Sequence, residues 1–152
     1  MLVPKSLREL LGPSQFSAEG FLGADERTPE AIIKDDETAL QALFTGKEAV
    51  ASALRDMYVR AERALGNPIT LAPSVTAVHE DARGRITSPF PSDGTFQKGQ
   101  VKITESTSGL TMLITPLSIH LIEKHGFFQG RGSRYRIEPA DAVKIIKLFS
   151  TI

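Results

Sequence analysis

The sequence predicts a single α+β domain, in which a helical N-terminal half precedes an antiparallel sheet of about four strands. Apolar residues repeat at helical spacing as far as Leu65, whereas from Ile69 onward apolar and polar residues alternate as in half-buried strands. Turn residues separate these alternating runs. The 152 residues are the usual length of one compact domain, so we expect residues 1–152 to form a single unit.

A short helix is expected near the start of the chain, because Ser6 and Glu9 have the spacing of a capping box. Gly12 and Pro13 would end it. Residues 12–27 hold three glycines and little periodicity, so we expect a loop or arm there. Its large apolar side chains would fold back onto the core or anchor a second subunit; they are Phe16, Phe21 and Leu22.

Two longer helices should complete the N-terminal half. Thr28 and Pro29 match an N-cap followed by proline in the first turn, and they open one broken helix or two short ones. Thr45 and Glu48 form a second capping-box pattern, and the helix that follows would end at Gly66. Its apolar stripe comprises Val50, Leu54, Met57, Tyr58, Ala61 and Leu65.

Four short strands are expected next, joined by turns into an antiparallel meander. The alternating segments are residues 75–80, 85–90, 95–105 and 110–114. Turn-forming residues separate them at positions 81–84, 91–94 and 106–109.

Helix, short hairpin and C-terminal helix should follow the sheet. Thr115 and Pro116 repeat the cap-then-proline pattern, and Gly126 is suited to end that helix. Residues 127–137 are typical of a hairpin with a glycine-rich turn, and Pro139 would begin the last helix.

The composition excludes several classes of protein. There is no cysteine, which removes thiol nucleophiles, thiolate metal sites and disulfides. No nucleophile elbow, dinucleotide fingerprint or phosphate-binding loop is present. The start of the chain does not resemble a signal peptide, and no apolar run is long enough to cross a membrane. We therefore expect a soluble cytoplasmic protein with no membrane contact and no cofactor.

The chain is neutral but polarised in charge. Eighteen basic residues balance eighteen acidic ones, yet the part before Gly66 carries a net −3 and the part after it a net +3. The two halves could attract each other within the fold, or copies of the chain could associate head to tail.

One basic cluster is the leading candidate for a binding site. Glycines beside arginines allow close backbone approach and bidentate binding of phosphate, and a tyrosine among them could stack on a base. The predicted anion-binding or nucleic-acid-binding residues are Lys124, Arg131, Arg134, Tyr135, Arg136, Lys144 and Lys147. The alternative is an exposed hairpin that its arginines keep soluble.

The histidines give no metal site at this stage. His120 and His125 are five residues apart, so on one regular helix they point about 140° away from each other. A site joining His79 to His120 would require the fold to bring them together. Acid–base catalysis by His79, Glu80 or Glu105 on the sheet also stays open.

Three functions are compatible with these patterns. We expect foremost a non-enzymatic binding or regulatory module that contacts an anionic partner, such as a nucleic acid, through the basic hairpin. The second is a protein-interaction or self-associating module, with homo-oligomers formed through the apolar arm. The third is a small-ligand protein or enzyme with a pocket between sheet and helices.

Overall fold

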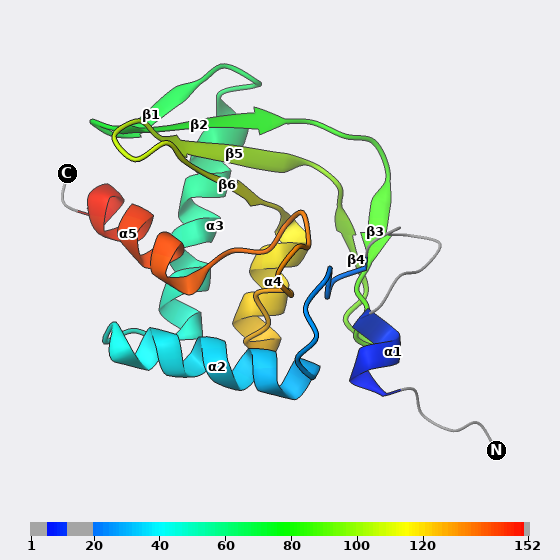
Figure 1. The fold of residues 1–152 in the computed structure, drawn as a ribbon. Coiled ribbons are helices and arrows are strands. Elements are labelled where there is room, and N and C mark those ends of the chain that lie inside the picture. Colours follow the sequence, from blue (N-terminus) through cyan, green and yellow to red (C-terminus); the bar gives the residue numbers. More distant parts are fainter. Residues whose placement is uncertain (1–5, 12–19, 151–152) are drawn as a thin grey trace.

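A computed structural model describes residues 6–11 and 20–150, which form the predicted α+β fold. A four-stranded antiparallel sheet lies along one side of the molecule, and the helices gather against one of its faces (Figure 1). Alternate strand residues are buried against those helices while their neighbours are exposed or half-buried. This alternation is the pattern of a sheet with one covered face.

The strand order in the sheet is β1-β2-β5-β6. β1 (Ile69–Ala72) pairs with β2 (Val75–Glu80), and β2 pairs along its whole length with β5 (Gln100–Glu105). β6 (Leu110–Ile114) completes the sheet beside β5.

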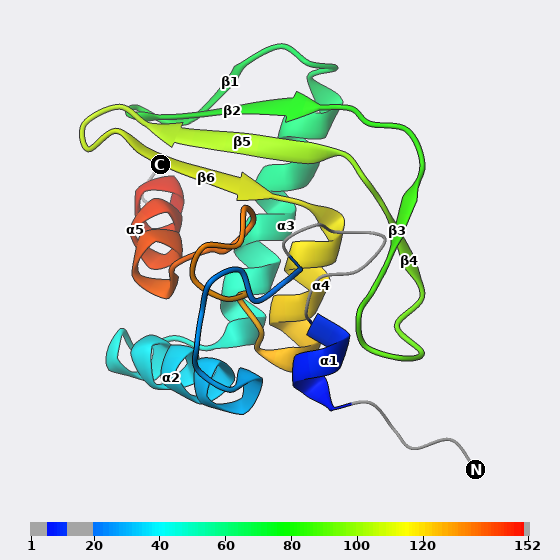
Figure 2. The ribbon, with the colours of Figure 1, turned by 45° about the vertical axis from the view of Figure 1, so that its right-hand side comes forward.

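The expected meander of successive strands is wrong, because the chain leaves the sheet after β2 and rejoins it at β5. Between them, β3 (Arg85–Thr87) and β4 (Thr95–Gln97) pair with each other in a separate ribbon (Figure 2). The fourth place in the sheet belongs to β1, which was not among the expected strands. Alternation of residues specifies which face of a strand is buried but not which strand is its neighbour.

Three helices begin at the prolines that the sequence marks. They are α2 (Pro29–Ala42), α4 (Pro116–His125) and α5 (Pro139–Ser150). The Thr28 side chain accepts the Ala31 N–H at the start of α2, which is one continuous helix. Thr115 and Ser118 form a complete capping box at the start of α4, and Gly126 ends that helix in the left-handed conformation.

The short helix α1 (Leu7–Leu11) is present, with the Ser6 hydroxyl accepting the Glu9 N–H. The long helix α3 (Lys47–Arg63) lacks the capping box expected from Thr45 and Glu48. Thr45 still belongs to the turn that ends α2, because its N–H bonds to the Leu40 carbonyl. Gly46 is therefore the N-cap, and it has no side chain with which to cap the helix.

The hairpin expected over residues 127–137 is not formed; residues 126–138 are a loop of turns without strands. The loop bonds instead to the segment before α2, which runs beside it in Figure 2. The Gly130 N–H donates to the Phe21 carbonyl, and the Ala24 N–H donates to the Arg131 carbonyl. A Cβ on Gly130 would lie only 2.1 Å from the Leu22 carbonyl oxygen, so the absence of a side chain allows this approach.

The predicted loop or arm over 12–27 is described only from residue 20 onward, and Phe16 lies outside the described residues. Residues 20–24 form turns. Leu22 is buried, and the half-buried Phe21 packs against the second of two apolar clusters. These two side chains therefore fold back onto the core.

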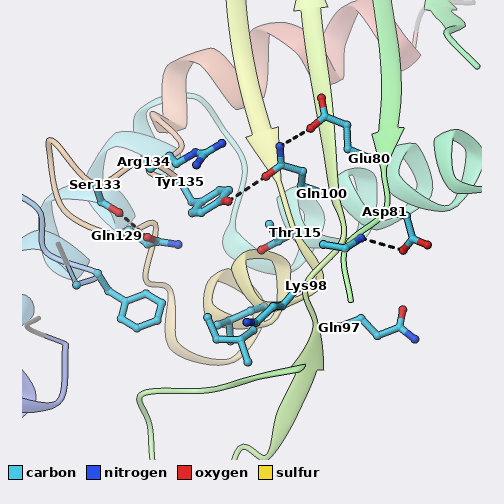
Figure 3. Close-up of a pocket in the computed structure, with 15 residues that line it drawn as sticks. Glu80, Asp81, Gln97, Lys98, Gln100, Thr115, Gln129, Ser133, Arg134 and Tyr135 are labelled. Atoms are coloured by element: carbon cyan, nitrogen blue, oxygen red, sulfur yellow. Dashed lines mark hydrogen bonds between the residues drawn. The ribbon is translucent and has the colours of Figure 1, made fainter. Parts of the chain in front are cut away.

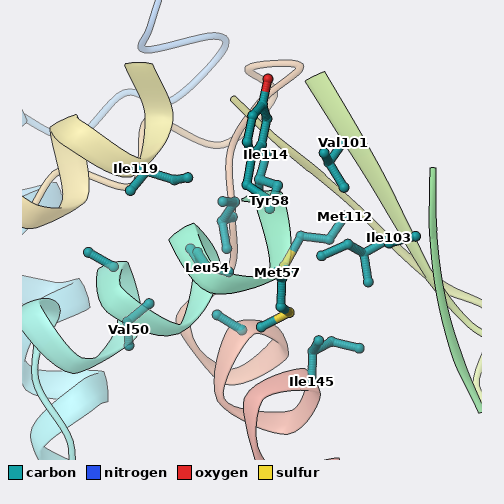
Figure 4. Close-up of a cluster of buried hydrophobic side chains, with 14 of the residues drawn as sticks. Val50, Leu54, Met57, Tyr58, Val101, Ile103, Met112, Ile114, Ile119 and Ile145 are labelled. Atoms are coloured by element: carbon teal, nitrogen blue, oxygen red, sulfur yellow. The ribbon is translucent and has the colours of Figure 1, made fainter. Parts of the chain in front are cut away.

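The larger apolar cluster lies between the sheet and the helices α3 and α5 (Figure 4). Leu54 and Met57 of α3 meet Ile103 of β5 and Ile145 of α5 there, all fully buried. The smaller cluster joins α1, α2 and α4 to residues of the ribbon. Across residues 6–11 and 20–150, no helix combines the length and apolarity that crossing a bilayer requires.

Candidate binding cavity

A cavity of about 660 Å³ lies where β2 ends, β5 begins and α4 starts, and the loop 126–138 closes another side (Figure 3). That volume is within the usual range for small-molecule sites. Because Glu80 pairs with Gln100 across the sheet, the last residue of β2 and the first of β5 enter its wall together.

A chain of hydrogen bonds fixes the wall between loop and sheet. The Tyr135 hydroxyl donates to Gln100 Oε1 at 2.9 Å, and Gln100 Nε2 donates to Glu80 Oε2 at 2.9 Å. These bonds hold the Tyr135 side chain against the sheet, and both are drawn in Figure 3.

Two side chains of the lining can each donate a hydrogen bond to a ligand, because a neighbouring residue already donates to the side-chain oxygen of each. Gln129 is only 4% exposed, and its side-chain carbonyl accepts the Ser133 hydroxyl at 2.7 Å. This bond orients the amide nitrogen toward the cavity (Figure 3). The side-chain oxygen of Thr115 accepts the Ser118 N–H in the capping box. The hydroxyl hydrogen of Thr115 is therefore left to donate to a ligand.

The charged residues of the lining divide between its sides. Arg134 lies on the loop side, whereas Glu80 and Asp81 lie on the sheet side (Figure 3). Lys98 also belongs to the lining. Neither Lys98 nor Arg134 forms an ion pair with another described residue, and both are exposed. Each is therefore free to bind an anionic group.

The structure distributes the seven predicted binding residues over several places. Arg134 and Tyr135 line the cavity, with the Arg134 guanidinium 5.4 Å from the centre of the Tyr135 ring. Arg131 is exposed, and its backbone N–H donates to Asp25. Lys144 and Lys147 are exposed on α5, outside the cavity lining.

Arg136 and Lys124 are occupied by carboxylates. The Arg136 side chain is 5% exposed, and its guanidinium forms a two-bond ion pair with Asp36, at 2.9 and 3.0 Å, as well as bonds to Glu138. Burial disfavours its charge, but the Asp36 and Glu138 carboxylates outweigh that effect and raise the Arg136 pKa. Lys124 Nζ lies 2.7 Å from Asp93 Oδ1. The basic loop thus lies against the acidic N-terminal half, which neutralises part of its charge.

The histidines are arranged differently from the sequence expectation. His120 and His125 do not point apart; both reach Asp93, with their Nε2 atoms 3.1 and 2.8 Å from Asp93 Oδ2. His125 is the last residue of α4, and Asp93 approaches from the loop of the ribbon. His79 belongs to another environment, where its Nε2 lies 3.2 Å from the Tyr58 hydroxyl. Burial is the largest cause of a rise in the Tyr58 pKa to about 12.

Sequence reasoning missed the uncharged part of the cavity. Gln100, Gln129 and Thr115 are common surface residue types, and their positions 14 to 29 residues apart follow no motif. Only the loop that packs between them brings them together. A glycine-rich segment next to a helix end was the single signal for that loop.

No protein-family model, curated protein or solved structure gives a significant match to this chain. Function is therefore inferred from the site geometry.

Proposed function

We propose that this protein is a binding module that takes a small anionic molecule, carrying a carboxylate or phosphate group, in the cavity. The observation behind this proposal is the combination of a 660 Å³ cavity with two cations, Lys98 and Arg134, that form no ion pair with another described residue. The Gln129 amide adds a neutral donor from the same loop as Arg134, and the Thr115 hydroxyl adds one from the start of α4. Donors that converge from separate elements are typical of sites that fix the orientation of a ligand.

A small molecule accounts for the geometry better than a nucleic-acid strand does. Arg136 is buried in its ion pairs, and Lys124 is bound to Asp93, so neither is available to a phosphate backbone. The Tyr135 hydroxyl is bound to Gln100. Arg131 and Arg134 are the exposed arginines of the loop, and they support a nucleic-acid partner only weakly.

Binding is favoured over catalysis by the way the polar residues of the wall satisfy one another. A chain of two hydrogen bonds joins Tyr135, Gln100 and Glu80, and the Gln100 amide is its middle member. An amide donates and accepts hydrogen bonds without titrating, so this chain positions groups rather than moving protons.

The proposal predicts that benzoate and phenyl phosphate bind, whereas the neutral benzamide does not. In ¹⁵N-labelled protein, either anion should shift the side-chain amide signals of Gln100 and Gln129 in a saturable manner. K98Q and R134Q should each weaken binding about ten-fold or more, because a charge-assisted hydrogen bond contributes roughly 1.5–3 kcal/mol. K147Q makes the same change of charge on α5, outside the lining, and should leave the affinity unchanged.

Absence of saturable shifts with both anions at millimolar concentration contradicts the proposal. Equal weakening by K147Q would indicate a non-specific charge effect. A single-stranded oligonucleotide that binds more tightly than either small anion, and weakens steeply with salt, would support the nucleic-acid partner instead.

A further inference from the structure

A second cluster of polar side chains lies on the ribbon side of α4, and no part of the proposed anion site uses it. Asp93 comes from the loop between β3 and β4, while His120 and His125 come from the middle and the end of α4. One ligating atom from each residue lies within 4.8 Å of the other two. We propose that Asp93, His120 and His125 bind one divalent transition-metal ion, of which zinc is the representative.

The distances among the three side chains suit a shared ion. Zinc binds nitrogen and oxygen ligands at about 2.0–2.1 Å, so two ligands of a tetrahedral site lie about 3.3 Å apart. The Nε2 atoms of His120 and His125 lie 3.1 and 2.8 Å from Asp93 Oδ2. Small outward movements of the side chains would therefore admit the ion without a change in the backbone.

His120 gives an independent indication that a partner belongs at this point. Its Nε2 is buried and has no hydrogen-bond partner among the described residues, because the approach to Asp93 is near in distance but not aligned. Buried polar atoms in folded proteins are nearly always satisfied. A cation bound to this nitrogen would satisfy it.

The surroundings hold the ligands in place near the surface of the protein. Phe90 stacks on the His125 ring with centroids 3.7 Å apart, and Phe96 lies 4.7 Å from the His120 ring. The Ser88 hydroxyl donates to Asp93 Oδ2, as an outer partner of a metal-bound carboxylate does. The two histidine side chains are still 20–23% exposed, so the cluster lies close to the surface although the His120 Nε2 atom itself is buried.

The ligand types select the class of ion. Two imidazoles with one carboxylate suit zinc, iron(II) and related ions, whereas magnesium and calcium prefer oxygen ligands alone. Three protein ligands leave a tetrahedral position for water or for another molecule.

Lys124 offers a competing account, in which its ammonium group alone neutralises Asp93. Its Nζ lies 2.7 Å from Asp93 Oδ1, but its side chain is 52% exposed and can turn away into solvent. If an ion binds beside Asp93, the ammonium repels it. The substitution K124M should then strengthen metal binding by at least about five-fold, which is the effect of one unit charge on another about 4 Å away in bulk water.

The test is a titration of the metal-free protein with zinc. Calorimetry measures the binding, and NMR records the ring signals of the three histidines during the titration. One equivalent should bind, and the His120 and His125 signals should shift while the His79 signal does not. H120A and H125A should each weaken binding by more than the 10–100-fold or so that loss of an outer partner causes. H79A is the matched control and should bind zinc as the wild type does.

Several results would overturn the proposal. One is the absence of zinc binding at micromolar concentration. Another is zinc binding that H120A does not weaken, and a third is a shift of the His79 signal in place of the His120 and His125 signals. The histidine signals are read in the wild-type protein, so the test stands even if a variant fails to fold. The anion titrations test Lys98 and Arg134, which are not metal ligands, so either proposal can be contradicted while the other stands.

Discussion

The buried ion pair between Arg136 and Asp36 shows that one residue can have a different role in the fold from the role that its sequence context predicts. As part of a basic segment, Arg136 was predicted to bind an external anion. In the fold the Arg136 side chain is 5% exposed, and the side chain of its partner Asp36 is 6% exposed. The two residues are one hundred positions apart, so no local pattern links them.

Removal of the Asp36 charge should destabilise the protein strongly. D36N leaves the Arg136 guanidinium buried with only the half-exposed Glu138 to neutralise it. We expect a loss of about 3 kcal/mol in the free energy of unfolding, measured by urea denaturation. The control is E123Q, which breaks the exposed pair with Arg55 and should cost at most about 1 kcal/mol. Equal losses in the two variants would contradict this account.

At the scale of elements, the turn between β5 and β6 depends on a buried carboxylate. Glu105 ends β5, and its side chain accepts the Ser108 hydroxyl and the N–H groups of Thr107 and Ser108. The Ser108 hydroxyl, followed by the Thr107 N–H, holds the Glu105 pKa well below its usual range. The ionised carboxylate is thus part of the turn.

This carboxylate should make stability depend on acid pH. Because its pKa is lower in the folded than in the unfolded chain, its contribution is complete above the unfolded pKa of about 4.3 and is lost as the pH falls further. E105Q should lower stability at pH 7 and reduce the decline between about pH 5 and pH 3, measured by urea unfolding at each pH. E26Q, at an exposed position, is the control for loss of one carboxylate. An unaltered decline in E105Q would contradict the assignment.

Helix boundaries and two pairs of successive strands could be predicted from the sequence, whereas the placement of the ribbon and of the loop 126–138 could not. Thr28 and Thr115 cap their helices as expected, because capping uses residues within one turn of each other. Residues 85–87 form a strand as expected, but it pairs with residues 95–97 in a ribbon outside the sheet, and the loop 126–138 bonds to the distant segment 20–24. The binding cavity depends on the second of these placements, and the histidine cluster depends on the first.

At the scale of the whole molecule, the acidic and basic halves of the chain pack against each other. Arg136 reaches back to Asp36 on α2, and the Arg131 N–H donates to Asp25 in the segment before α2. The polarised charge of the sequence is therefore used, at least in part, between the halves of one chain. The backbone contact between the loop 126–138 and the segment 20–24 joins them further.

That backbone contact should tolerate no side chain at position 130. G130A places a Cβ 2.1 Å from the Leu22 carbonyl oxygen, so one of the two segments must move. We expect a loss of about 1–3 kcal/mol in the free energy of unfolding, together with faster hydrogen exchange at the Ala24 amide. At Gly46 the nearest atom to a Cβ is 3.7 Å away, so G46A should cost less than about 1 kcal/mol. Unchanged stability in G130A would contradict this packing.

The way in which the loop 126–138 closes on the segment 20–24 also determines which parts of this protein can be separated from the rest. The cavity lining runs from Gly20 to Tyr135, and both ends of that span contribute backbone or side-chain groups. The helices α1, α2 and α3 contribute no residue to this lining, and a fragment that holds only the sheet contains one wall without the loop opposite it. The site therefore cannot be transplanted as a linear motif, and a search of other chains for it must compare arrangements in space.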